Sequence, residues 1–220
     1  MKLLALDTAT ERCSVALLID DRIVERATET PRGHADLVLP MVEEVLAEGG
    51  LTLRQLDGLA YGRGPGGFTG VRIAVGVAQG LAYGAQLMTV GISDLAAVAQ
   101  QFAAPGARIL VCMDARMKEV YWGRFEATPD GLVQPTAPER VDRPEAVEAG
   151  DATIFAGTGF GAYPQLLAGR TAAAVHREAR PNARDIARLA AAELRAGRGQ
   201  PPEQAQPVYL RDQVAVVKSP

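Results

Sequence analysis

The first fifty residues change from short apolar runs to a longer helical pattern. Residues 2–8 and 13–19 are apolar runs typical of strands, and a further strand-like run follows Asp20 and Asp21, which mark a turn. From Ala35 onward, apolar side chains recur at helical spacing until Gly49 and Gly50 end the pattern. We therefore expect a meander of three strands followed by a helix.

The next fifty residues predict strands alternating with helices. The stretch "LDGLAYG" is an apolar strand that leads into a glycine-rich loop, and a second helix is expected to begin near Thr69 as its N-cap. The stretch "LMTVGIS" predicts a buried strand, and Ser93 is the expected cap of a helix that reaches Gln101. The segment 103–107, "AAPGA", reads as a hinge.

The second half repeats this plan. Strands are predicted over "RILVCMDA" and "EVYWGRFEA", joined by "RMK", and again over "TIFAGTG". The most clearly marked helix runs from Asn182, the expected N-cap with Asp185 three residues on, to Gly197. These patterns predict an α/β protein of two lobes, each a mixed sheet with helices. We place the N-terminal lobe at 1–103 and the C-terminal lobe at 104–220.

Composition narrows the classes of function. The 220 residues are 48% hydrophobic and 22% charged, which is typical of a soluble protein, and no stretch is long and apolar enough to span a membrane. The net charge of −3 gives no overall attraction for nucleic acid. Cys13 and Cys112 lie in separate strand-like runs, so we expect buried free thiols in a cytoplasmic protein.

The loop "GRGPGGFTG" satisfies the letters of two phosphate-binding motifs but lacks a required residue of each. Gly62, Gly64 and Gly67 spell G-x-G-x-x-G, yet no acid stands between Phe68 and Ser93 to hold a ribose. Read as a Walker A loop, the same stretch has Phe68 where a lysine should contact phosphates. The simpler interpretation is that the glycines turn the chain sharply between a strand and a helix.

The helix after this loop carries Gly76, Gly80 and Gly84 at four-residue spacing. An interior glycine costs about 0.5–1 kcal/mol relative to alanine, so a repeated ridge needs a reason. A ridge of small residues lets a second helix approach closely. That helix is either packed inside its own lobe or shared with a partner, and chemistry alone leaves both open.

Several stretches resemble a known family. The segment "GRGPGGFTGVRIAVGVAQGLA", the opening "LLALDTATERCSVALL", the helix "HADLVLPMVEEVL" and the tail "PVYLRDQVA" are similar to the corresponding segments of the TsaB family. The resemblance spans residues 2–215. It implies the two-lobed actin-like or sugar-kinase-like (ASKHA) fold, in agreement with the pattern of strands and helices.

The same resemblance implies a function. TsaB proteins are partners of their catalytic paralogue TsaD, which forms threonylcarbamoyladenosine beside the tRNA anticodon, and of the small ATPase TsaE. We expect a homodimer when the chain is alone, tRNA contact only through the complex, and no cofactor of its own, with ATP or ADP at the partner interface left open. The implied partner interface comprises His34, Leu37, Val38, Met41, Val42, Val45, Phe68, Val71, Arg72, Val75, Gly76, Gln79, Gly80 and Tyr83.

The residues argue against chemistry by this chain. The catalytic paralogue carries two metal-binding histidines at i and i+4, whereas here His34 is followed by Val38, so no metal site is expected. Asp7 and Thr8 are the candidates for a nucleotide-site remnant, but a strand-end aspartate that binds turn amides is the favoured interpretation of Asp7. The glycine-rich stretch 156–161 lies where an adenosine loop would be, but it is otherwise unspecific. A small-molecule phosphotransferase of the same fold and a metallopeptidase are the alternatives to a non-catalytic partner.

Overall fold

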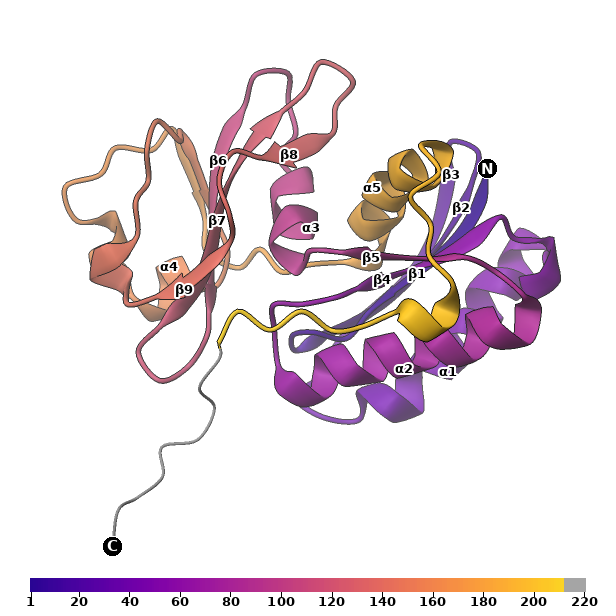
Figure 1. Ribbon diagram of the computed structural model, residues 1–220. Coiled ribbons are helices and arrows are strands. Elements are labelled where there is room, and N and C mark those ends of the chain that lie inside the picture. The colour runs from indigo at the N-terminus through magenta and orange to yellow at the C-terminus, as the bar shows by residue number, and fades with distance from the viewer. Residues whose placement is uncertain (212–220) are drawn as a thin grey trace, which may run out of the picture.

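The computed structural model describes residues 1–211, which form two lobes, each built on a mixed β-sheet (Figure 1). The first sheet has the strand order β3-β2-β1-β4-β5. Its strands are β1 (Lys2–Asp7), β2 (Arg12–Ile19), β3 (Arg22–Glu29), β4 (Gly58–Gly62) and β5 (Thr89–Ile92). The first three strands form the expected antiparallel meander, and β4 and β5 continue the sheet parallel to β1.

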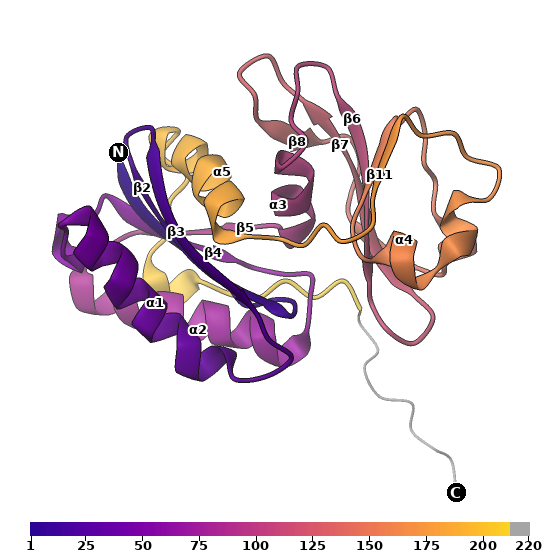
Figure 2. The same cartoon turned by 180° about the vertical axis from the view of Figure 1, so that it is seen from behind.

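Three helices cover the first sheet. The helices α1 (His34–Gly49) and α2 (Phe68–Ala85) lie side by side on one face, and α5 (Ala183–Arg195) covers the other (Figures 1 and 2). Short 3-10 turns add η1 (Leu53–Gln55) and η4 (Pro202–Gln204), and η4 packs against α2. The first lobe is therefore a three-layered α/β/α unit.

The second sheet has the strand order β11-β10-β6-β7-β8, and β9 pairs with the free end of β7. Its strands are β6 (Arg108–Asp114), β7 (Val120–Ala127), β8 (Val133–Pro135), β9 (Arg140–Asp142), β10 (Ile154–Ala156) and β11 (Ala174–His176). The short helix α4 (Gly159–Ala162) and the 3-10 turns η2 (Pro144–Ala146) and η3 (Pro164–Leu167) cover its outer face. The helix α3 (Asp94–Gln100) lies between the two sheets.

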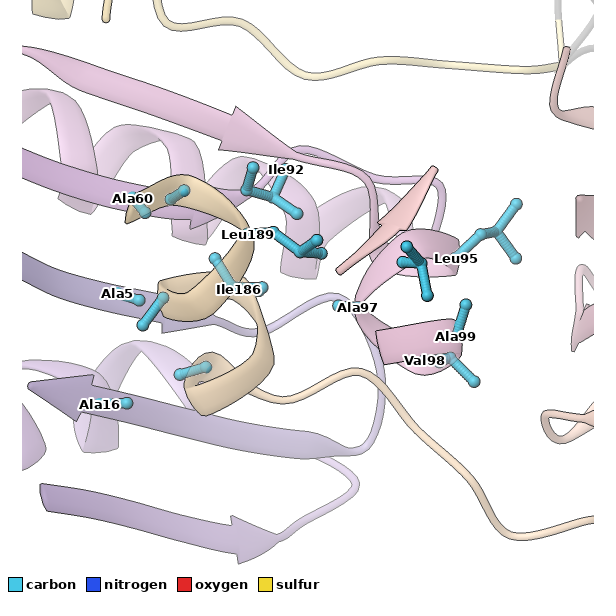
Figure 3. Packing of buried hydrophobic residues seen from close by; sticks show 14 of the residues in the cluster. Ala5, Ala16, Ala60, Ile92, Leu95, Ala97, Val98, Ala99, Ile186 and Leu189 are labelled. Carbon is cyan, nitrogen blue, oxygen red and sulfur yellow. The ribbon is translucent and has the colours of Figure 1, made fainter. Parts of the chain in front are cut away.

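The position of α5 follows from small residues on the first sheet. Ala5 pairs with Ala16 on one side and Ala60 on the other, which makes a strip of alanines across three strands. Ile186 and Leu189 of α5 pack above this strip (Figure 3). Short side chains on the sheet let the larger helical side chains approach closely, so the interface is filled without large residues on both sides.

One hydrophobic cluster joins the lobes. It contains strand residues from both sheets together with α3 and α5. The division at residues 103 and 104 needs a correction, because α5 and η4 come from the 104–220 segment yet pack against the first sheet. The chain enters the second lobe after α3 and returns to the first at α5.

The caps test the predicted helix boundaries. Ser93 accepts a hydrogen bond from the Ala96 amide at the start of α3, and Asn182 accepts one from the Asp185 amide at the start of α5, so both predicted N-caps are confirmed. The prediction for α2 was wrong by two residues. Its N-cap is Gly67, with no side-chain cap, and Thr69 is already inside the helix.

Candidate partner surface and interlobe cleft

The glycine loop packs against the turn between β1 and β2. The Gly67 amide donates to the Ala9 carbonyl at 2.7 Å, and the Thr8 hydroxyl donates to the Gly70 carbonyl at the same distance. A Cβ on Gly66 would lie 2.6 Å from the Ala9 oxygen, and one on Gly70 would overlap the Thr8 oxygen. These glycines therefore allow two backbone segments of the same chain to touch, which explains the loop without a bound phosphate.

Asp7 and Asp94 form a buried carboxyl pair next to this loop. Neither side chain is exposed, and the two carboxyl groups lie close enough for each to shift the pKa of the other. Burial raises the pKa of Asp7 to about 6. Burial, reinforced by the nearby Asp7 carboxylate, raises the pKa of Asp94 well above its usual range, so Asp94 holds the proton of the pair.

Backbone amides fix the orientation of this pair. Asp7 accepts a hydrogen bond from the Ala9 amide at 3.0 Å, and Asp94 accepts one from the Gly64 amide at 2.6 Å. These bonds tie the end of β1, the glycine loop and the start of α3 together. Asp7 has the geometry of a strand-end aspartate that binds a turn, and its side chain does not reach solvent.

His34 begins α1 and contacts backbone. Its Nε2 lies 2.9 Å from the Thr10 carbonyl, an acceptor, so this nitrogen carries the proton. Four residues on, Val38 is fully buried. Among residues 1–211, no three His, Cys, Asp or Glu side chains are grouped so that they could hold a metal ion. The geometry gives His34 a role in anchoring α1 to the β1–β2 turn.

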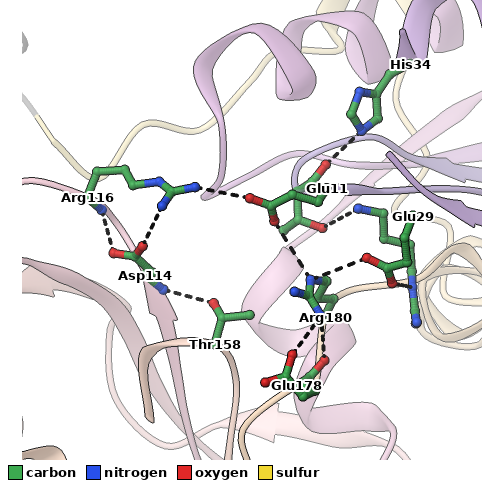
Figure 4. Close-up of polar contacts among 10 residues, drawn as sticks. Glu11, Glu29, His34, Asp114, Arg116, Thr158, Glu178 and Arg180 are labelled. Carbon is green, nitrogen blue, oxygen red and sulfur yellow. Dashed lines mark hydrogen bonds and ion pairs between the residues drawn. The ribbon is translucent and has the colours of Figure 1, made fainter. Parts of the chain in front are cut away.

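A cleft of about 1190 Å³ opens between the lobes, and ion pairs cross it (Figure 4). Glu11, in the β1–β2 turn, contacts Arg116 of the β6–β7 hairpin at 3.1 Å and Arg180, before α5, at 3.8 Å. Arg116 also binds Asp114, and Arg180 lies 3.4 Å from Glu178. Glu11 thus connects the first lobe to two segments that enter from the second.

Five residues of the expected partner interface are in the core of the first lobe. Val38, Val42 and Val45 of α1 and Val71 and Val75 of α2 are buried against the sheet. A partner cannot contact these side chains in this conformation. These valines form an apolar stripe at helical spacing. Such a stripe occurs both on a helix face that packs on its own sheet and on one that binds a partner, so the spacing alone does not distinguish the two.

The remaining candidates reach the surface. His34, Leu37, Met41 and Gln79 are half-buried, while Phe68, Arg72, Gly76, Gly80 and Tyr83 are exposed. Gln79 also donates to the Ala205 carbonyl at 2.8 Å, which holds η4 against α2. The exposed and half-buried set therefore defines the part of α1 and α2 that a partner can reach.

The glycine ridge faces outward. A Cβ built on Gly76, Gly80 or Gly84 meets no atom of the described residues within 4 Å. The alanines at 74, 78 and 82 point the opposite way and are fully buried. The sequence left open whether the glycine ridge packs inside its own lobe or is shared with a partner. The structure excludes packing inside the lobe. We call the outward surface of Gly76, Gly80, Tyr83 and Gly84 the α2 ridge.

Comparison with known proteins identifies the family. A family model described as "TsaD: tRNA N6-adenosine threonylcarbamoyltransferase" matches residues 26–219. The tRNA threonylcarbamoyladenosine biosynthesis protein TsaB of Escherichia coli (strain K12) is 41% identical over 230 residues, covering 100% of this chain and 99% of that protein. The chain belongs to the TsaB family. The TsaB protein of Haemophilus influenzae is 39% identical over 236 residues and covers 100% of this chain.

Solved structures support the family and the fold. A Pseudomonas aeruginosa protein described as similar to peptidase YeaZ superposes with a TM-score of 0.88 at 45% identity, covering 96% of this chain and 99% of that one. A second Pseudomonas aeruginosa structure, described as YeaZ, gives a TM-score of 0.87 at 45% identity. The predicted TsaB resemblance and the two-lobed ASKHA-type fold are confirmed. The tail match at residues 212–215 lies outside the described residues.

Several structural features of this TsaB homologue were not predicted from sequence. Asp94, Glu11 and Arg180 come from three separate segments of the chain. Asp94 begins a helix, Glu11 lies in a turn and Arg180 lies in a loop, which are ordinary places for a charged residue in a sequence. Only the fold brings them to the lobe junction. Within residues 1–211, no helix is both long and apolar enough to cross a membrane.

Proposed function

We propose that the chain is the non-catalytic subunit of the complex that forms threonylcarbamoyladenosine in tRNA. It binds and supports a TsaD-like catalytic paralogue that modifies the adenosine beside the anticodon, together with a TsaE-like ATPase. Its family membership supports the pathway. The observation that carries the role of partner is the outward α2 ridge, where Gly76 and Gly80 leave open space on a helix that packs against α1.

The physical argument concerns the cost of the glycines. Glycine in the middle of a helix is destabilising relative to alanine, and neither Gly76 nor Gly80 is required by any contact within residues 1–211. A ridge without side chains lets the backbone of another helix approach closely. We propose that the same surface forms a homodimer when the chain is alone, so that the paralogue competes with the second copy.

The site favours a supporting role over chemistry. The Thr8 hydroxyl is engaged by the glycine loop, and Asp7, the acid that a phosphotransferase of this fold would need, is buried in a pair with Asp94. The phosphotransferase alternative predicts turnover of ATP with sugars or small acids as acceptors. We expect none from the isolated chain, and turnover that Asp7→Ala abolishes would favour the alternative.

A reconstitution experiment tests the proposal. The purified chain, a TsaD-like paralogue and a TsaE-like ATPase are mixed with tRNA and the threonylcarbamoyl donor, and modified adenosine is measured by mass spectrometry. We expect modification with all components and little when this chain is omitted. Capture of the paralogue, with and without ATP, is measured in parallel. Full modification without the chain, or no capture under either condition, would contradict the proposal.

A further inference from the structure

The mouth of the interlobe cleft carries an exposed stack of flat side chains. Phe68 begins α2, and Tyr209 belongs to the C-terminal segment that crosses from the first lobe to the second past this end of α2 (Figure 1). Their ring centroids are 5.8 Å apart. The Arg72 guanidinium lies 3.4 Å from the Phe68 centroid and 5.4 Å from that of Tyr209. Phe68 is 53% and Tyr209 44% exposed, so this stack faces solvent.

Among residues 1–211, three arginines with no carboxylate partner line the same cleft as this stack. Arg32, Arg72 and Arg177 line the cleft, and none of the three has a carboxylate within 4.0 Å in the part of the chain that the structure describes. The acids that line the same cleft, Glu11, Asp114 and Glu178, are already paired with Arg116 or Arg180. The cleft mouth is therefore locally cationic, although the whole chain has a net charge of −3.

The β6–β7 hairpin adds a strained tip beside the mouth. Arg116, Met117 and Lys118 have φ values of 60°, 54° and 63°, the left-handed region that costs non-glycine residues on the order of 1 kcal/mol each. The tip is held in place by Arg211, which donates to the Ala115 carbonyl. It exposes 67% of Met117 and three-quarters of the Arg116 side chain. Strained, exposed backbone of this kind is concentrated at binding sites.

We propose that this mouth binds a single-stranded segment of RNA within the assembled complex. An unpaired base stacks on the surface of Phe68, Arg72 and Tyr209, and phosphates are neutralised by Arg32 and Arg177, with the exposed hairpin tip beside them. Aromatic rings and guanidinium planes are the groups that bind unstacked bases, and free arginines bind the backbone. The proposal rests on the proposed function, because the paralogue brings the RNA to this chain.

The charge distribution favours RNA over a protein partner at this mouth. A protein would need to supply several carboxylates to neutralise the three free arginines, whereas an RNA segment supplies one phosphate for every nucleotide. The small number of contacts also explains why the isolated chain is expected to bind tRNA weakly at physiological salt. The inference moves Phe68 and Arg72 from the partner interface to the cleft mouth, next to the α2 ridge.

Binding of a labelled RNA tests the proposal. The probe is a fluorescein-labelled anticodon stem-loop RNA, and anisotropy is measured with the complex of the full chain and its paralogue over a range of salt concentrations. Tyr209→Ala is expected to weaken binding about five-fold or more. Arg177→Gln is expected to weaken it and to reduce the slope of log K against log salt by about 0.7. Arg54→Gln, an exposed arginine outside the cleft, is the matched control and should change neither.

Two exposed tyrosines separate RNA binding from assembly. Tyr83 is 77% exposed on the α2 ridge, and Tyr209 is at the cleft mouth. We expect Tyr83→Ala to weaken capture of the paralogue, and Tyr209→Ala to weaken RNA binding while capture stays at the native level. Thermal melting confirms that each variant is folded.

The outcomes distinguish this inference from the proposed function. Native RNA affinity for both Tyr209→Ala and Arg177→Gln would overturn the inference and leave the proposed function intact. Loss of paralogue capture by these variants would assign the mouth to a protein partner, which also overturns it. If the native chain captures no paralogue, the proposed function fails. In that case the same anisotropy measurement is made with the isolated chain at about 50 mM salt, where phosphate contacts are strongest. Binding there that Tyr209→Ala weakens would support the inference, and no binding would overturn it.

Discussion

Asp7 and Asp94 meet in the interior at the junction of the two lobes, one from the end of β1 and the other from the first turn of α3. A Cβ on Gly62 would overlap the Asp94 carboxyl group and lie 2.5 Å from that of Asp7, so only glycine fits above the pair. Because α3 packs against the second sheet and against α5, while Asp7 ends a strand of the first sheet, the proton shared by these two acids contributes to holding the lobes together.

The shared proton gives stability a pH dependence. The folded-state pKa values of both acids are raised, Asp7 to about 6 and Asp94 further, so the folded chain binds more protons than the unfolded chain above about pH 4. The free energy of unfolding should therefore fall as pH rises from about 4 through about 6 and beyond. One pKa unit corresponds to about 1.4 kcal/mol, so Asp7 alone should contribute a loss on the order of 3 kcal/mol between pH 4 and 8, and Asp94 adds to it.

The variant Asp94→Asn isolates this pair. Its amide oxygen still accepts from Gly64 and its NH₂ donates to Asp7, so the hydrogen bonds remain while the shared proton is removed. Urea unfolding across the pH range should show a smaller loss of stability than in the native chain. Some dependence remains, because burial also raises the pKa of Asp185 to about 6. Asp21→Asn, at an exposed acid, should leave the profile unchanged; an unchanged profile for Asp94→Asn would contradict the shared proton.

Replacing glycines of α2 with alanine should raise the free energy of unfolding at some positions and lower it at another. Gly76→Ala and Gly80→Ala should each stabilise the isolated chain by about 0.5–1 kcal/mol, because the new methyl group meets open space and alanine favours helix. Gly70→Ala should destabilise it by about 1–3 kcal/mol, since its Cβ overlaps the Thr8 carbonyl. Chemical denaturation measures both. Destabilisation by Gly76→Ala that does not depend on protein concentration would place the ridge in contact with the rest of the chain, whereas a concentration-dependent loss would come from the homodimer.

The two arginines that bind Glu11 should contribute unequally to the free energy of unfolding. Arg180 is 21% exposed and lies within 4.0 Å of Glu11, Glu29 and Glu178, so Arg180→Met leaves three acids without this cation. We expect a loss of about 1–3 kcal/mol in the free energy of unfolding. Arg116 is 75% exposed, and Arg116→Met should cost less than about 1 kcal/mol. Equal losses, measured by urea unfolding at two salt concentrations, would contradict this ranking.

Both thiols should be unreactive in the folded chain. Cys13 and Cys112 are free and buried, as the sequence predicted. Burial raises the pKa of Cys13 to about 11 and that of Cys112 higher still, so almost no thiolate is present at neutral pH. Ellman's reagent should label neither cysteine until urea unfolds the chain. Rapid labelling of native protein would show that one strand opens without global unfolding.

Local signals in the sequence predicted local structure well. The caps at Ser93 and Asn182 and the turn at Asp20 were all recognisable, because a cap or a turn is decided by a few neighbouring residues. The family signature was equally local. The boundary of α2 was misplaced because Gly67 caps the helix through its backbone, which leaves no side-chain signal.

Long-range relations could not be predicted from the same patterns. The return of α5 to the first sheet depends on the alanine strip of Ala5, Ala16 and Ala60, which three separate strands supply. The pairing of Asp7 with Asp94 joins residues far apart in sequence, and so does the stack of Phe68 with Tyr209. The family resemblance implied that α1 and α2 form the partner surface, and apolar spacing could not tell which face of each helix is buried, so valines such as Val38 were assigned to that surface.

The variant Gly80→Leu tests the central claim, that the α2 ridge is the surface on which this chain binds its partner. A leucine at this exposed position has room within the isolated chain, so melting temperature and circular dichroism should stay close to native. Light scattering and capture of the paralogue are then measured on the same sample. The account predicts a folded monomer that no longer captures the paralogue. A folded Gly80→Leu protein that still dimerises and captures the paralogue with native affinity would contradict it.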